Sequence, residues 1–179
     1  MIEIIPTGHD AVHPQPGDIL FVHRNGFASS LIRFFERAFG GDARWSHIAV
    51  CDDVRPGDME PMLIEALTKG VCRHPLSEYR EIEYGICRMQ MSREDGSQAA
   101  AFLFSCIGER YAWGTILSIG VRYFTGRSGF ALGGSSTKIC SVLAAQTAVR
   151  SWPIYPHDPQ TITPGELAAY HATHSASNP

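Results

Sequence analysis

Apolar and polar residues alternate along the first half of the chain, in short runs that end at glycine, proline or charged residues. This pattern is typical of β-strands, because successive side chains of a strand point to opposite faces of a sheet. Between the first two runs, apolar residues recur at helical spacing after Ser29 and Ser30, which can cap a helix running to about Ala38. We therefore expect one early helix and strands at 18–23, 46–51, 62–67, 70–73 and 83–90.

The second half of the chain changes to helical spacing of apolar residues, interrupted by a glycine- and serine-rich loop at 126–138. Strands followed by helices predict an α+β fold, in which helices cover one side of an antiparallel sheet. A single helical turn is expected over 75–79, and the chain after His171 is expected to be flexible. The later helices are expected at 95–107, 116–124, 139–150 and 164–171.

Length and charge restrict the function without naming it. The chain has 179 residues with no internal repeat, so we expect one domain over 1–179 with an ordered core at about 14–171. A formal net charge of −3 argues against nucleic acid as a partner. No run approaches the roughly 20 apolar residues of a membrane helix, and the N-terminus does not resemble a signal peptide. We expect a cytoplasmic protein without stable membrane insertion; later export or release and the oligomeric state stay open.

The five cysteines are odd in number and have no Cys-x-x-Cys spacing, so neither a disulfide framework nor a zinc site is predicted. We expect no metal and no cofactor. A metal site of histidines and carboxylates is an alternative, although none of its candidates has the spacing of a zinc motif: His23, His47, His74 and His157. Four cysteines lie within predicted elements and are interpreted as core thiols: Cys51, Cys72, Cys87 and Cys106.

Three polar residues interrupt otherwise apolar elements. His47 lies on one predicted strand, where it shares a face with Ala49. Glu65 lies on another, in a row with Leu63, and burying its carboxylate without a partner would cost several kcal/mol. His47 is such a partner if the two strands pair. Cys140 begins an apolar helix, where free N–H groups and the helix dipole stabilise a thiolate.

As a set, Cys140, His47 and Glu65 are a nucleophile, a base and an orienting group. In a cysteine hydrolase the imidazole takes the thiol proton, the carboxylate fixes the ring, and backbone N–H groups around the cysteine bind the oxyanion. Each residue also has a structural interpretation: a core thiol, a structural histidine, and a carboxylate that faces solvent at a sheet edge. The hypothesis therefore depends on the set and not on any one member.

Four segments occur in a distinctive order: PGDILF at 16–21, WSHIAV at 45–50, IEALTKGVCRHPL at 64–76 and KICSVLAAQ at 138–146. They resemble the circularly permuted branch of the NlpC-type, papain-like cysteine hydrolases, which includes the lecithin–retinol acyltransferase-like proteins. In that branch the histidine strand precedes the cysteine helix. The resemblance extends roughly from Pro16 to Leu167. It implies a papain-like fold with Cys140 as nucleophile, His47 as base and Glu65 as the third polar member.

RYAWG at 110–114 is similar to the Tyr-x-Trp-Gly segment that precedes the cysteine in unpermuted relatives. This similarity implies that Tyr111 positions the substrate or the oxyanion. Two features depart from the family pattern: Thr115 replaces the second glycine, and the stretch from there to Lys138 is long. A core aromatic residue at a helix end is the alternative interpretation of Tyr111.

The resemblance also implies a small-molecule acyl or peptide substrate. Unpermuted members cut peptidoglycan stem peptides, and permuted members are linked with amide or ester bonds of lipids and acyl amines. Apolar residues at 27–39 and 116–132 would line an acyl site. We predict a thiol hydrolase or acyltransferase that cleaves an amide or ester bond, and the alternative is a non-catalytic ligand-binding module that retains the fold.

Overall fold

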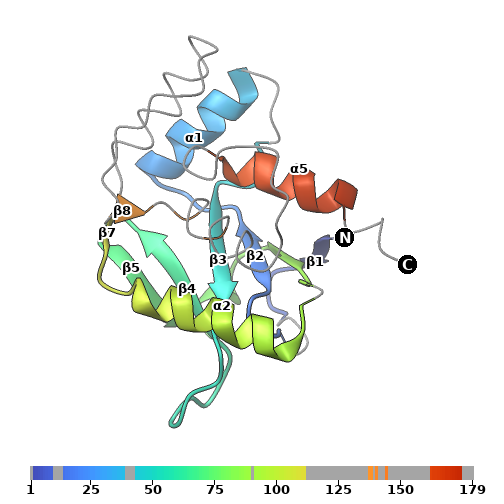
Figure 1. Cartoon of the computed structure of the whole chain (residues 1–179). Helices are drawn as coiled ribbons and strands as arrows, with labels where there is room; N and C mark the ends of the chain where they lie inside the picture. Colours follow the sequence, from blue (N-terminus) through green and yellow to red (C-terminus); the bar gives the residue numbers. More distant parts are fainter. Residues whose placement is uncertain are drawn as a thin grey trace.

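A six-stranded antiparallel sheet, in the order β1-β6-β2-β3-β4-β5, is the centre of the molecule (Figure 1). The computed structural model describes residues 2–9, 14–38, 43–89, 91–111, 137–138, 140, 144 and 162–174. Together with its helices, the sheet confirms the predicted α+β class. The strands of this sheet are β1 (Ile2–Ile5), β2 (Ile19–Val22), β3 (His47–Cys51), β4 (Met62–Leu67), β5 (Gly70–Pro75) and β6 (Tyr84–Cys87).

The described helices begin and end close to the predicted bounds, because capping and apolar spacing mark them in the sequence. At the start of α2 the Ser92 hydroxyl accepts a hydrogen bond from the backbone N–H of Asp95, so it caps the helix. Cys140 and Ala144 are helical as well. The other residues of 139–150 and the expected helix at 116–124 lie outside the described residues. The regular helices are α1 (Phe27–Ala38), α2 (Arg93–Ser105) and α5 (Pro164–His174), and η1 (Leu76–Tyr79) is the expected helical turn.

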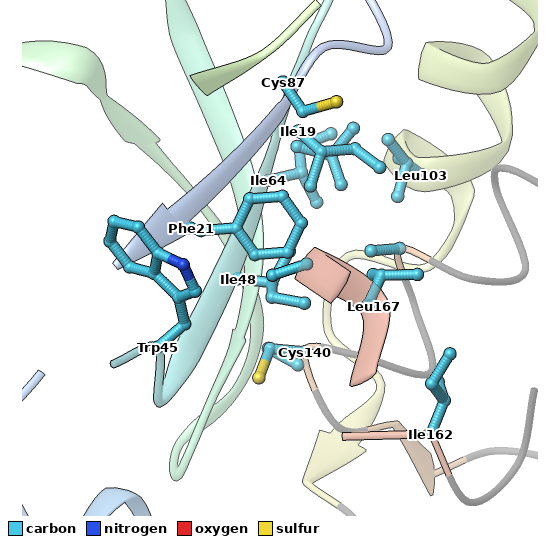
Figure 2. Packing of buried hydrophobic residues seen from close by; sticks show 14 of the residues in the cluster. Ile19, Phe21, Trp45, Ile48, Ile64, Cys87, Leu103, Cys140, Ile162 and Leu167 are labelled. Atoms are coloured by element: carbon cyan, nitrogen blue, oxygen red, sulfur yellow. The ribbon is translucent and has the colours of Figure 1, made fainter. Parts of the chain in front are cut away.

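The sheet buries apolar side chains on both faces. On the first face, Phe21 and Ile48 pack with Leu103 of α2 and Leu167 of α5, and Cys140 belongs to the same cluster (Figure 2). The second face forms a separate cluster in which η1 covers strands β2, β3, β4 and β6; it includes Leu20, Val22, Ala49, Leu63, Leu76, Tyr79 and Ile86. Helices α2 and α5 therefore cover one face, as predicted, while a short turn covers the other.

Three short strands were not predicted. β1 pairs with β6 and lies before residue 14, so the described fold begins earlier than the expected 14–171 core. β7 (Arg110–Tyr111) and β8 (Thr137–Lys138) form a parallel pair, and β8 falls in the range expected to be a loop. These strands have only two to four residues, too few to show a periodic pattern of their own.

The β4–β5 hairpin is joined to the segment that leads into β7. Gly70 has a φ of +118°, and a Cβ there would lie 2.7 Å from the Glu109 carbonyl oxygen, so glycine fits this position. The Val71 N–H donates to that same carbonyl at 2.9 Å, and the Gly108 N–H donates to the Val71 carbonyl at 2.9 Å. This backbone pairing covers the outer edge of β5.

No helix in the described part of the chain is long and apolar enough to cross a bilayer.

Candidate active site

His47 and Glu65 meet because β3 and β4 pair in one register. Ala49 lies opposite Glu65, and His47 is two residues from Ala49, so the imidazole and the carboxylate share one face of the sheet. His47 Nε2 forms a short ion-paired hydrogen bond with Glu65 Oε2. The strand pairing on which the sequence prediction depended is therefore present.

Glu65 is 1% exposed, and Oε2 accepts hydrogen bonds from two further donors. The Tyr79 hydroxyl donates at 2.5 Å, and Arg24 Nη1 donates at 3.3 Å. Burial alone would raise the pKa of Glu65, but the hydrogen bond and charge of His47, followed by the Tyr79 hydrogen bond and the charge of Arg24, lower it overall. The carboxylate is thus held in its charged form inside the protein.

Tyr79 supports this carboxylate from η1. Its ring is buried, packs edge-on against Tyr84, and lies under the Arg24 guanidinium at 5.5 Å. Burial, together with the charge of Glu65, raises the pKa of Tyr79 far above its usual range. The phenol therefore keeps its proton and acts only as a hydrogen-bond donor toward Glu65.

Cys140 brings a thiol to the other side of the imidazole. It is buried and helical, lies two residues after the end of β8, and hydrogen-bonds with the His47 side chain. In Figure 2 its sulfur points away from Ile162 and Leu167. His47 is the first residue of β3, so its ring lies at the end of the strand, where a residue of the first core cluster can reach it.

The charge of the imidazole is the main electrostatic feature of the site. Burial by itself would lower the pKa of His47, but the negative charge and hydrogen bond of Cys140, with those of Glu65, raise it to about 9. His47 therefore stays an imidazolium at neutral pH.

The structure thus brings together three of the four predicted site residues, which we call the inner triad: Cys140, His47 and Glu65. The fourth, Tyr111, is placed only through its backbone. It pairs with Lys138 in the parallel β7–β8 ladder, two residues before Cys140. Its side chain lies outside the described residues, so its role stays a prediction.

A second group of the same residue types, which we call the outer triad, lies on β5 and η1: Cys72, His74 and Glu78. His74 Nε2 is 3.1 Å from Cys72 Sγ, and His74 Nδ1 is 3.1 Å from Glu78 Oε1. Burial and the charge of Glu65 raise the pKa of Cys72, which keeps this thiol protonated. His74 Nε2 is also 4.0 Å from Glu65 Oε1, a buried atom without a hydrogen-bond partner among the described residues.

All five cysteines are free. Cys51 is buried on β3, and burial followed by the charges of Asp18 and Asp52 raises its pKa to about 12, so it is inert as a nucleophile at neutral pH. Cys87 and Cys106 are buried in the first core cluster. These three positions agree with the interpretation of core thiols, whereas Cys72 is only partly buried and belongs to neither core cluster.

The alternative metal site finds no support in the part of the chain described. Among the residues placed there, no group of three or more histidine, cysteine, aspartate or glutamate side chains is arranged to hold an ion. His23 hydrogen-bonds with the Arg44 carbonyl, while His47 and His74 belong to the two triads. His157 lies outside the described residues.

Sequence reasoning did not single out Tyr79 or Arg24, although both contact Glu65. The available signal was the buried carboxylate itself, which demands several donors, but it does not say which tyrosine or arginine supplies them. Neither models of known protein families nor curated proteins match this chain.

Proposed function

We propose that the protein is a cysteine hydrolase or acyltransferase that cleaves an amide or ester bond through Cys140, His47 and Glu65. The observation that carries the proposal is one buried imidazole that hydrogen-bonds with both a thiol and a charged carboxylate. A structural histidine needs only one such partner. A thiol and a carboxylate on the same ring match the roles of nucleophile and orienting group.

In the proposed reaction, the Cys140 thiolate attacks the substrate carbonyl carbon and forms a tetrahedral oxyanion. When this intermediate collapses, the bond to the amine or alcohol breaks and His47 gives its proton to the leaving group. A thioester then joins the acyl group to Cys140. Water, or an acceptor hydroxyl or amine, loses a proton to His47 as it attacks the thioester, which releases the product and restores the thiolate–imidazolium pair.

Other groups are assigned supporting roles in this proposal. Backbone N–H groups at the start of the Cys140 helix would stabilise the oxyanion, with Tyr111 as a further candidate. Tyr79 and Arg24 are positioning residues, because they act on the reaction only through Glu65. Their hydrogen bonds hold the carboxylate where it can orient the His47 ring.

The proposal includes a permuted, papain-like arrangement and a substrate class. An antiparallel sheet that carries histidine and carboxylate early in the chain, with a helical cysteine late in it, supports the permuted order. A lipid or acyl amine and a peptidoglycan fragment are the two substrate classes that the family resemblance suggests.

Intact-protein mass spectrometry tests the reaction directly. The protein is incubated with pools of acyl esters, acyl amides and muropeptides, and we expect an adduct with the mass of the acyl group on Cys140. Cys140→Ala abolishes this adduct, whereas Cys72→Ala and Cys106→Ala retain it. An adduct of equal yield in Cys140→Ala refutes the nucleophile. No adduct and no turnover with any pool favours the non-catalytic ligand-binding module instead.

A further inference from the structure

We infer that Arg24, supported by Arg33, recognises an anionic group of the substrate, a carboxylate or a phosphate, close to the bond that is cleaved. This inference rests on the proposed function and adds a substrate class to it. Its evidence is two guanidinium groups, those of Arg24 and Arg33, whose charge the carboxylates of the described residues do not match.

Arg24 lies at the outer side of the Glu65 cluster, and its side chain is 32% exposed, compared with 1% for Glu65. Its guanidinium has five N–H donors, and among the described residues one of them is used, in the 3.3 Å bond to Glu65. The contact with Tyr79 uses the face of the guanidinium, and no described residue other than Glu65 accepts a hydrogen bond at its edge. The planar edge of an arginine fits the two oxygens of a carboxylate or phosphate.

A second cation, Arg33, contacts the backbone of Arg24. Its guanidinium donates to the Arg24 carbonyl at 2.5 Å and to the hydroxyls of Ser46 and Ser30 at 3.4 Å each. These acceptors are neutral, and no carboxylate in the described part of the chain pairs with Arg33. Glu36, one turn along α1, is buried and accepts a hydrogen bond from the Gly165 backbone N–H.

The described charged side chains around Arg24 therefore carry a net positive charge. Among the described residues of this cluster, His47, Arg24 and Arg33 are cationic and Glu65 is the carboxylate that pairs with the first two, so the cations outnumber the carboxylate. A half-buried cation without a carboxylate strengthens the attraction for an external anion. Ser46 connects this cluster to the reaction centre, because its hydroxyl accepts from the Arg24 backbone N–H and it precedes His47 in the chain.

Arg24 and His47 share Oε2 of Glu65, so an anionic group that binds Arg24 would extend past the imidazole to its Glu65 side. Three esters distinguish the position of that group. Para-nitrophenyl acetate is neutral, mono-para-nitrophenyl glutarate carries a carboxylate in the acyl part, and para-acetoxy-meta-nitrobenzoate carries one in the leaving group. Each releases a coloured phenol, so kcat/KM is measured in the same way.

For each variant we compare kcat/KM of each anionic ester with that of the neutral ester. Arg24→Gln is expected to lower this ratio by about tenfold or more for one of the two anionic esters, since charge-assisted hydrogen bonds contribute roughly 1.5–3 kcal/mol. The ester affected tells which side of the scissile bond faces Arg24. Arg44→Gln is the matched control: it removes one exposed charge that pairs with Glu83, and it leaves the ratio unchanged.

An unchanged ratio in Arg24→Gln overturns the inference, and so does an equal fall in Arg44→Gln, which would indicate only a general charge effect. If the wild-type protein turns over no ester, the proposed function fails separately. Anion binding is then measured by protection of Cys140 from iodoacetamide with inorganic phosphate or glutarate. Protection in the wild type that is lost in Arg24→Gln upholds the anion site, and the absence of protection refutes it.

Discussion

The inner and outer triads contain the same three residue types, and Glu65 contacts a histidine of each. Its Oε2 atom pairs with His47, and its Oε1 atom lies 4.0 Å from His74. The difference lies in how each carboxylate is held. Glu65 is buried and has two extra donors, whereas the side chain of Glu78 is 49% exposed and bonds one imidazole nitrogen. Solvent screens an exposed pair, so Glu78 stabilises a cationic histidine much less than Glu65 does.

The same contrast extends to the thiols. Cys140 lies beside an imidazole that keeps its proton up to a pH of about 9, while burial raises the pKa of Cys72 and favours its neutral form. Residue types in hydrogen-bonding range are therefore not enough to make a nucleophile. A buried, permanently charged carboxylate on the far side of the ring is the feature that separates the two groups.

The largest difference between the triads is expected from their carboxylates. Glu65→Gln keeps the shape of the side chain but removes its charge, so the imidazolium loses the support of the Glu65 carboxylate. We expect kcat/KM for para-nitrophenyl acetate to fall by about a hundredfold or more. Glu78→Gln, the matched change in the outer triad, should alter it less than twofold. Similar losses in both variants, with unchanged thermal unfolding, would contradict the assignment of the inner triad.

The next effect is the dependence of stability on pH. The raised pKa of His47 means that its contribution to folding is complete below its unfolded value of about 6.5 and is lost as pH rises toward about 9. Glu65 has a lowered pKa, so its contribution is present above about 4.5 and is lost as pH falls through the folded value. Both contributions to folding are complete only between about pH 4.5 and about pH 6.5.

Urea unfolding at pH 6 and pH 9.5 measures the His47 contribution. The wild-type protein should lose on the order of a few kcal/mol of unfolding free energy between these pH values. His47→Gln should lose clearly less, because the titrating group is gone, while His74→Gln should behave as the wild type does. If His74→Gln loses the pH dependence and His47→Gln keeps it, the buried cation belongs to the outer triad instead.

The smallest effect on the rate is expected at the hydroxyl of Tyr79. Tyr79→Phe keeps the packed ring and removes one hydrogen bond to Glu65, so we expect kcat/KM to fall by about tenfold. That hydrogen bond lowers the pKa of Glu65, so its loss should move the acid limb of the pH–rate profile to higher pH. A fall in rate with an unmoved acid limb would indicate a role in packing alone.

The sequence predicts the parts of this site that leave a local signal. Alternation along 62–67 predicts the strand that carries Glu65 with its observed bounds, and the cost of burying that carboxylate predicts a partner on β3. Tyr79 and Arg24 leave no such signal, because a tyrosine in a helical turn and an arginine in a loop fit many surroundings. Their roles follow from contacts across 14 and 41 residues of chain.

The β7–β8 pair shows the same limit. Two residues per strand are too few for a periodic pattern, and the pairing joins segments separated by the whole stretch from Tyr111 to Thr137. The family resemblance pointed to Tyr111 for its side chain, whereas the described structure involves its backbone, next to the segment that leads into Cys140.

The position of the strands along the chain has a consequence for biosynthesis. All six strands of the main sheet end by Cys87, whereas Cys140 follows α2 and the β7–β8 pair. A ribosome therefore delivers the base and its carboxylate to the folding sheet well before it delivers the thiol. Under the proposed function, a nascent or truncated polypeptide that lacks Cys140 has the proposed base without the proposed nucleophile, so reactivity toward acyl groups would begin only late in translation.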